Sequence, residues 1–148
     1  MVLVPVKERF EDNEVFITHP KCMESLDMSV KFFANVGYYP PWIGYYAQLN
    51  GTFVGGAAFK GKPRAGKVEI AYTTFPNFQR QGVGSRMCQK LVELALHTDP
   101  LVIIAARTLT EESFSTRILK KNNFKCLGIV VDEDDGEVWE WEYDGTIN

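Results

Sequence analysis

The sequence has few cysteines, no surplus of positive charge and no long hydrophobic run. Its three cysteines, Cys22, Cys88 and Cys126, are scattered, which excludes a disulfide framework or a spaced metal site and favours a reducing compartment. The formal net charge is −3, whereas nucleic-acid-binding domains usually carry a basic surplus. The longest apolar run, Leu101 to Ala106, is too short to span a membrane. We therefore expect no metal, no nucleic acid and no membrane partner.

The N-terminal residues MVLVPVKERFEDNE lack the long apolar stretch of a secretion signal, and acidic residues come early. We therefore expect a cytoplasmic protein. Its 148 residues suffice for one domain, 1–148, with a core of its own. Asn50-Gly51-Thr52 has the form of a glycosylation acceptor, but without a secretion signal it is better interpreted as a hairpin turn.

Hydrophobic spacing and turn residues predict the order of the elements. Apolar residues at three- and four-residue steps predict a helix from Pro20 to Val36, which Gly37 ends. Asn50-Gly51 predicts a hairpin between strands at 42–49 and 52–59. Other strands are expected within 2–17 and at 68–74, 101–106, 124–131 and 137–143, and other helices from about 82 to 97 and from the capping residue Thr110 to Lys121. Helices on a mostly antiparallel sheet make an α+β, or mixed α/β, domain.

The stretch FPNFQRQGVGSRMC, residues 75–88, places Gly82 and Gly84 between a strand and an amphipathic helix. Such an elbow can hold an anion, because the first N–H groups of the helix point outward and the helix dipole adds about half a positive charge. A phosphate loop of the Gly-x-x-x-x-Gly-Lys-Ser/Thr type is absent, and Met87 stands where a dinucleotide fold has its third glycine. Close packing of helix on sheet is the structural alternative for a bare pair of glycines.

The motif Gln79-x-x-Gly82-x-Gly84 resembles the acyl-CoA signature of the GNAT acetyltransferases. VEIAY, residues 68–72, is similar to the Glu-Ile-Gly-Tyr strand of the branch that includes ribosomal-protein N-terminal acetyltransferases, and residues 106–124 resemble a second block of that branch. The resemblance covers about Trp42 to Tyr143. It implies a GNAT-like central, mostly antiparallel twisted sheet with helices on both faces and a splayed acyl-CoA cleft.

The resemblance also implies acetyl-CoA as acyl-donor cosubstrate and a set of residues that hold it. Backbone groups near Thr73, Thr74 and Phe75 would pair with the pantetheine arm, and one N–H would polarise the thioester carbonyl. N–H groups from Gln81 to Ser85 would hold the pyrophosphate. The expected cofactor-binding residues are Thr73, Thr74, Phe75, Gln79, Arg80, Gln81, Gly82, Val83, Gly84 and Ser85. The basic loop 60–67 could meet the 3′-phosphate, although a solvated loop is the simpler interpretation.

Three positions depart from the family pattern. Glu112 stands where the branch usually has asparagine, a residue often near the pantetheine arm. Asn123 replaces a glycine, which is a mild change because asparagine tolerates the left-handed conformation. Leu119 occupies the place where some relatives carry a tyrosine that protonates the leaving thiolate. An acid, if one exists, must come from elsewhere.

Glu69 is the predicted catalytic residue. An attacking amine must be neutral, and free amines have pKa values of about 10.4 for lysine and about 7.7–8.0 for an α-amine, so a general base assists the reaction. Glu69 lies mid-strand, and alternation puts its side chain on the opposite face from Val68 and Ile70. A paired or solvent-facing structural carboxylate is an equally weighted alternative.

The sequence thus predicts an acetyl-CoA-dependent N-acetyltransferase that acts on a primary amine of a small molecule or peptide. The alternative is a non-catalytic acyl-CoA-binding sensor or interaction module, which Leu119 favours and Glu69 opposes. The sequence does not identify the acceptor. A homodimer is a further expectation, by analogy with relatives that dimerise.

Overall fold

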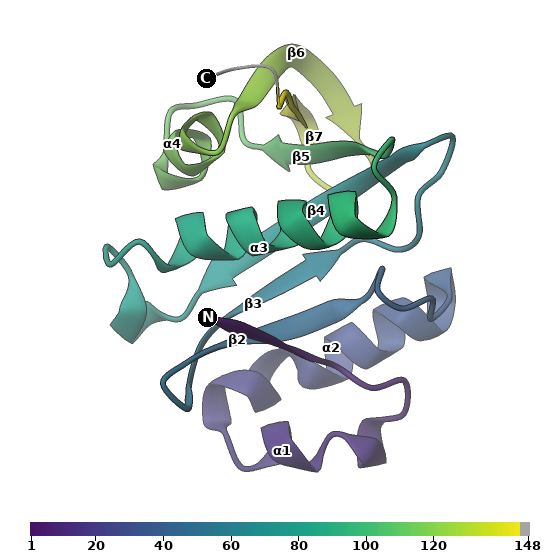
Figure 1. The fold of residues 1–148 in the computed structure, drawn as a ribbon, viewed down its shortest axis with the longest axis vertical. Coiled ribbons are helices and arrows are strands. Elements are labelled where there is room, and N and C mark those ends of the chain that lie inside the picture. Colours follow the sequence, from purple (N-terminus) through teal and green to yellow (C-terminus); the bar gives the residue numbers. More distant parts are fainter. Residues whose placement is uncertain (146–148) are drawn as a thin grey trace.

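The computed structural model describes residues 1–145, which form one seven-stranded sheet with helices packed on it (Figure 1). In chain order the elements are β1 (Val2–Pro5), η1 (Phe10–Asp12), α1 (Glu14–Ile17), α2 (Pro20–Val36), β2 (Gly44–Leu49), β3 (Thr52–Phe59), β4 (Lys67–Thr74), η2 (Pro76–Phe78), α3 (Val83–Thr98), β5 (Ile103–Thr108), α4 (Phe114–Lys121), β6 (Phe124–Asp132) and β7 (Gly136–Tyr143). None of the helices in this part of the chain is long and apolar enough to cross a membrane.

The strands follow the order β1-β2-β3-β4-β5-β7-β6, and all neighbours are antiparallel except β4 and β5. This parallel pair needs a crossover connection, which α3 provides. Only three residue pairs join the two strands, and the last is Glu69 with Ala105. Beyond it β4 continues to Thr74 with β3 alone as its partner, so β4 and β5 diverge (Figure 1). The predicted mostly antiparallel, splayed fold is confirmed.

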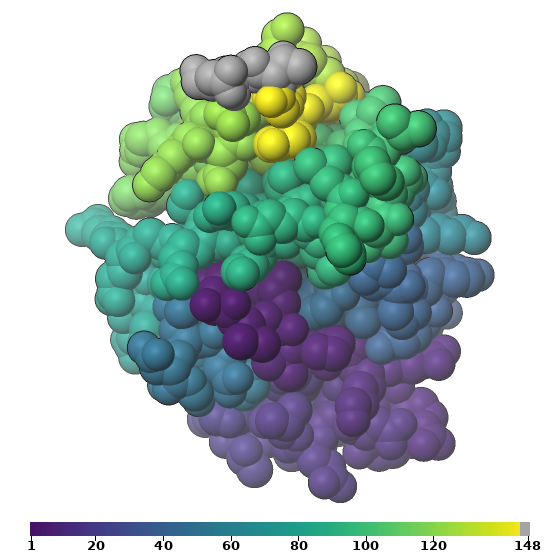
Figure 2. All heavy atoms as spheres, viewed as in Figure 1, coloured from purple at the N-terminus to yellow at the C-terminus, as the bar shows by residue number. Residues whose placement is uncertain are grey.

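Helices cover both faces of the sheet. Phe53 and Val54 are neighbours in β3 and therefore point to opposite faces. Phe53 packs in a cluster with buried residues of α1 and α2, among them Leu26, whereas Val54 packs in a cluster that holds Met87 and Leu91 of α3. In the space-filling view α3 forms a band across its face of the molecule, between β1 and the region of α4 and β6 (Figure 2).

The N-terminal half follows the sequence signals closely. Helix α2 spans Pro20–Val36, with Pro20 in its first turn and Gly37 just beyond its end, as predicted. The β2–β3 hairpin turns at Asn50 and Gly51, whose φ values of 49° and 80° are the left-handed conformations that an Asn-Gly turn requires. Asn123, with φ of 67°, takes the left-handed position after α4. Both turn predictions are confirmed.

Two boundaries were predicted wrongly. Helix α4 begins at Phe114 and is capped by Ser113, not Thr110. Ser113 and Thr116 form a capping box, in which the side chain of each residue accepts a hydrogen bond from the backbone N–H of the other. Glu111 and Glu112, which fall within the predicted helix, precede the observed one. Strand β5 begins at Ile103, not Leu101, which is 90% exposed. The side chain of Asp99 accepts a hydrogen bond from the Leu101 N–H. The start of the apolar run therefore lies in a turn and not in the strand.

Candidate functional site

A cavity of about 390 Å³ opens where β4 leaves β5, beside the first turn of α3 and one face of α4. It is lined by Tyr72, Thr73, Thr74, Phe78, Gln79, Arg80, Gly82, Val83, Gly84, Ser85, Phe114, Ser115, Arg117, Ile118 and Lys121. The β4 residues are those that have lost β5 as a neighbour. The cavity therefore combines an open strand edge with a helix N-terminus.

The predicted cofactor residues line this cavity with two exceptions. Phe75 is 8% exposed and packs in the core cluster of α1 and α2. Gln81 does not line the cavity, and its side-chain amide donates to the backbone oxygen of Asn77 at 3.3 Å. Sequence reasoning also missed Tyr72 and Phe78, and the other missed lining residues come from α4. Their spacing, 114, 117, 118 and 121, is that of one helix face, which was the only signal available.

The two glycines of the elbow serve different purposes. Gly82 caps α3 in the left-handed conformation, with φ of 78°, and a Cβ added there would meet nothing within 4 Å. A Cβ on Gly84 would lie 2.8 Å from Cδ1 of Ile118 and 3.4 Å from Oγ1 of Thr74. Gly82 thus provides a turn that leaves the cavity open, whereas Gly84 lets α3 approach α4 and β4 closely.

We predict that Gly84→Val destabilises the protein by about 1–3 kcal/mol, because the added methyl groups overpack against Ile118. Urea denaturation measures the loss. Ile118→Ala removes the colliding group, so the double variant should recover part of the stability expected from the sum of the single changes. Strict additivity of the two losses would contradict the close contact.

The charged side chains that line the cavity are all positive. Arg80, Arg117 and Lys121 line it, and no aspartate or glutamate does. Within residues 1–145 none of these three cations forms an ion pair with a carboxylate, whereas Lys120, the neighbour of Lys121, pairs with Glu112 at 3.0 Å. In a chain of net charge −3, this concentration of free cations favours an anionic ligand.

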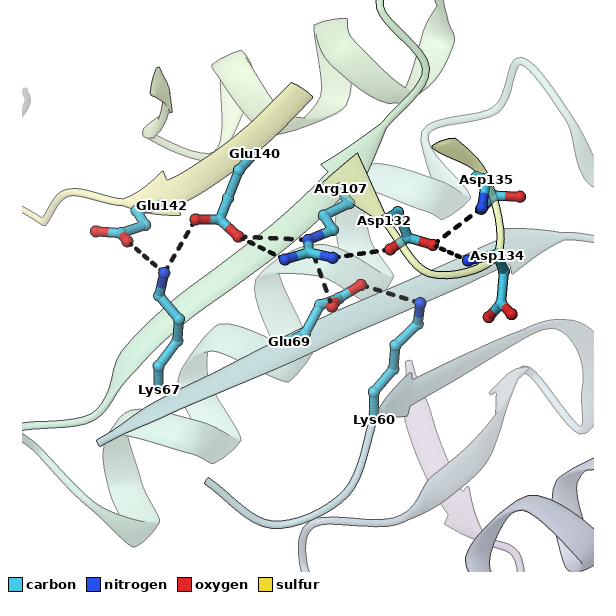
Figure 3. Close-up of polar contacts among 9 residues, drawn as sticks. All are labelled: Lys60, Lys67, Glu69, Arg107, Asp132, Asp134, Asp135, Glu140 and Glu142. Carbon is cyan, nitrogen blue, oxygen red and sulfur yellow. Dashed lines mark hydrogen bonds and ion pairs between the residues drawn. The ribbon is translucent and has the colours of Figure 1, made fainter. Parts of the chain in front are cut away.

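Glu69 lies outside the cavity, in a network of ion pairs on the opposite face of the sheet (Figure 3). Its neighbours Val68 and Ile70 pack in the α3 cluster, so the Glu69 side chain points away from α3, as alternation predicts. One carboxylate oxygen of Glu69 lies 3.0 Å from Nζ of Lys60, and the other lies 4.0 Å from Nε of Arg107. Glu69 also belongs to the last β4–β5 pair, so it marks the vertex of the divergence.

Arg107 connects Glu69 to the C-terminal hairpin. Its Nη1 donates to Asp132 at 2.8 Å, and its Nε and Nη2 donate to one oxygen of Glu140 at 3.3 Å each. Lys67 contacts Glu140 and Glu142 at 3.0 Å each and does not contact Glu69 (Figure 3). Lys60 and Lys67 lie at the two ends of the basic loop 60–67. Both form ion pairs in this network, and neither lines the cavity.

A family model described as an acetyltransferase (GNAT) domain matches residues 4–125, which is most of the chain. The chain belongs to the GNAT family. No curated protein sequence gives a significant match. The family uses acetyl-CoA, and the protein is a GNAT N-acetyltransferase.

Solved GNAT structures share the fold at low identity. A chimeric spermidine N-acetyltransferase from Vibrio cholerae and hSSAT has a TM-score of 0.71 and 11% identity over 97% of this chain and 95% of its own. An aminoglycoside acetyltransferase in complex with coenzyme A has a TM-score of 0.68 and 18% identity, covering 98% and 95% of the two chains. A ribosomal-protein-alanine N-acetyltransferase from Brucella melitensis has a TM-score of 0.66 and 14% identity, covering 96% and 98%.

The position of the acid tyrosine of some GNAT relatives is not available for catalysis here. Leu119 is 1% exposed and packs in the main core cluster, away from the cavity. Tyr72 does line the cavity, but burial raises the pKa of its hydroxyl, which is hydrogen-bonded to the buried Cys88. Burial likewise raises the pKa of the Cys88 thiol to about 12. A hydroxyl or a thiol with a raised pKa is a weaker proton donor. Neither the Tyr72 hydroxyl nor the Cys88 thiol is therefore suited to protonate a leaving thiolate.

We predict that Asp132 makes stability depend on pH. The hydrogen bond from Arg107, followed by those from the backbone N–H groups of Asp134 and Asp135, lowers the pKa of Asp132 to about 2. Because the folded pKa is depressed, this stabilisation is complete above the unfolded value of about 3.9 and is lost as pH falls toward 2. Thermal unfolding should show wild type melting above Asp132→Asn at pH 7, with the gap closing below pH 4. A gap that persists at the lowest pH would contradict this assignment.

Proposed function

We propose that the protein transfers the acetyl group of acetyl-CoA, bound in the cavity between β4, α3 and α4, to a primary amine. The nitrogen–carbonyl bond forms by direct attack on the thioester, the carbon–sulfur bond breaks, and the sulfur leaves as the thiolate of CoA. The observation that carries the proposal is the cavity itself, where a helix N-terminus and an open strand edge meet three cations, Arg80, Arg117 and Lys121, that have no carboxylate partner within residues 1–145.

The donor site has a polar and an extended part. The first turn of α3 offers its N–H groups from Gly82 onward, and Arg80 stands beside them, which suits a pyrophosphate. The edge of β4 at Tyr72, Thr73 and Thr74 has no strand partner toward β5, so its backbone groups can pair with an extended amide-containing arm such as pantetheine. A backbone N–H on this edge would stabilise the developing oxyanion.

Glu69 is proposed as the general base. It lies three residues upstream of the cavity-lining part of β4, a distance of about 10 Å along a strand. Its carboxylate stands at the vertex of the divergence on the face away from α3, where an acceptor amine can approach the gap. Because Lys60 and Arg107 hold the carboxylate in place, it would accept the proton of the amine directly or through one water.

The acceptor is proposed to be a primary amine of a small molecule or a peptide. The structural neighbours act, by their names, on spermidine, aminoglycosides or a ribosomal-protein alanine, which all present amines. The VEIAY strand resembles the ribosomal-protein branch and favours a peptide α-amine among these. An α-amine also places the smallest demand on the base, since its pKa of about 7.7–8.0 leaves much of it neutral.

The non-catalytic alternative rests on the buried Leu119, since no acid tyrosine faces the cavity from that position. Thioester consumption separates the two proposals. The protein would be titrated with acetyl-CoA in a calorimeter and then assayed for thiol release with peptides, polyamines and aminoglycosides. Amine-dependent thiol release supports the acetyltransferase. Saturable binding without turnover across the panel would favour the sensor, and no binding near millimolar acetyl-CoA would overturn both.

A further inference from the structure

Strand β6 is an open edge of the sheet. It is the last strand in the order β1-β2-β3-β4-β5-β7-β6, so within residues 1–145 it pairs with β7 alone, and it lies at the rim of the molecule (Figure 1). The opposite edge, β1, has four residues and ends with Pro5, and a short edge strand with a proline discourages pairing with another chain. Strand β6 has nine residues and no proline. Its outer backbone groups can therefore accept a further strand.

Three apolar side chains of β6 are exposed to solvent. The exposed fraction is 51% for Leu127, 59% for Ile129 and 78% for Val131. The pairing with β7 shifts register at Leu127, which is a bulge, but residues 128–132 pair with β7 in unbroken register. Ile129 and Val131 lie two residues apart in this regular segment and therefore point to the same face of the sheet. Beyond the bulge, β6 thus combines free backbone groups with an exposed apolar face.

The two ends of β6 carry opposite charges. Lys125 lies near the start of the strand, whereas the turn after its end consists of Glu133, Asp134 and Asp135. None of these four side chains forms an ion pair in the part of the chain that the structure describes. An antiparallel copy of β6 would place the acidic turn of one chain beside Lys125 of the other, whereas a parallel copy would bring like charges together. The strand is therefore complementary to a second copy of itself in the antiparallel orientation.

We propose that β6 is the interface of a homodimer, in which two copies of the strand pair antiparallel about a two-fold axis through Val130. In this register Ile129 of each chain lies opposite Val131 of the other on the same face of the sheet, and the bulge at Leu127 lies outside the paired segment. The two seven-stranded sheets become one continuous sheet. The assembly closes at two copies, because the pairing uses the β6 edge of both chains. The proposal goes beyond the proposed function and does not depend on it, since β6 contributes no residue to the donor cavity.

Sedimentation equilibrium of the full chain tests the interface by measuring the dissociation constant of the dimer. The wild-type protein should form dimers in the micromolar range and nothing larger. Ile129→Lys should weaken the dimer at least about 100-fold, because each dimer then places two charges in an apolar contact. Leu109→Lys is the matched control, since Leu109 is also 59% exposed but follows the interior strand β5, and it should leave the dimer unchanged. A wild-type protein that stays monomeric up to about 1 mM, or that assembles beyond two copies, would overturn the proposal.

Charge reversal tests the antiparallel orientation separately. Lys125→Glu should weaken the dimer about tenfold, because the new carboxylate faces the acidic turn of the other chain. The double variant Glu133→Lys, Asp135→Lys should weaken it to a similar extent, because its lysines then face Lys125. When all three substitutions are combined in one chain, opposite charges face each other again and the affinity of the wild type should return. A combined variant that dimerises no better than the others would overturn the antiparallel pairing, and a folded Ile129→Lys variant with wild-type affinity would overturn the interface.

Discussion

Gly82→Trp is expected to weaken the binding of CoA at least about 100-fold, equivalent to about 2.7 kcal/mol, whereas Gly51→Trp leaves it unchanged. The two glycines have nearly the same backbone, with φ of 78° and 80°, and neither has any atom within 4 Å of an added Cβ. A side chain in this left-handed conformation costs roughly 1–2 kcal/mol at either site. Only Gly82 lines the cavity, so only there does the indole occupy the space of the ligand.

The comparison thus separates lost binding from lost folding. Calorimetric titration with CoA gives the affinities, and urea denaturation of both variants gives the cost in stability. Similar stabilities with a large difference in affinity would locate the ligand over the elbow. Equal CoA affinities in the two variants would mean that Gly82 serves only the turn, and the donor site would have to be sought elsewhere.

Several local features of the fold, the glycine elbow among them, could be predicted from sequence because their signals lie within a few residues. Pro20 and Gly37 bound α2, Asn50-Gly51 turns a hairpin, and the glycines of 82–84 open α3, each within a few residues of the structure it specifies. Backbone conformations of this kind depend on the residue itself and on its nearest neighbours. The same locality made the left-handed Asn123 predictable.

The surroundings of Glu69 could not be predicted in the same way. Arg107 is separated from Asp132 by 25 residues and from Glu140 by 33, and these contacts exist only because β7 lies between β5 and β6. The alternation of side chains along β4 predicted which face of the sheet carries Glu69, but it could not predict the ion-pair partners of Glu69, Lys60 and Arg107. The α4 lining was missed for a related reason, since a helix face is visible in sequence but the element that it faces is not. The choice of Ser113 over Thr110 depended on two reciprocal hydrogen bonds, in which the backbone N–H of Ser113 donates to the Thr116 hydroxyl and that of Thr116 donates to the Ser113 hydroxyl.

Glu69→Gln is expected to lower kcat about 100-fold with the preferred amine, because the amide cannot accept a proton. The dissociation constant of CoA should not change, since Glu69 lies outside the cavity. The loss of its contacts with Lys60 and Arg107 should cost less than about 1 kcal/mol of stability, because the pairs are partly exposed. Steady-state thiol release at saturating acetyl-CoA measures kcat, and calorimetry measures binding.

The pH dependence of this deficit distinguishes a base from a structural carboxylate. As pH rises past the pKa of the acceptor, about 7.7–8.0 for an α-amine or about 10.4 for a lysine, the amine loses its proton unaided and the benefit of Glu69 declines. The ratio of wild-type to Glu69→Gln activity should therefore shrink with rising pH. Lys67→Gln is the matched control, because it removes a charge from the same network without touching Glu69 and should keep near wild-type kcat. An equal loss in both variants, constant with pH, would show that the network supports the sheet and that the base lies elsewhere.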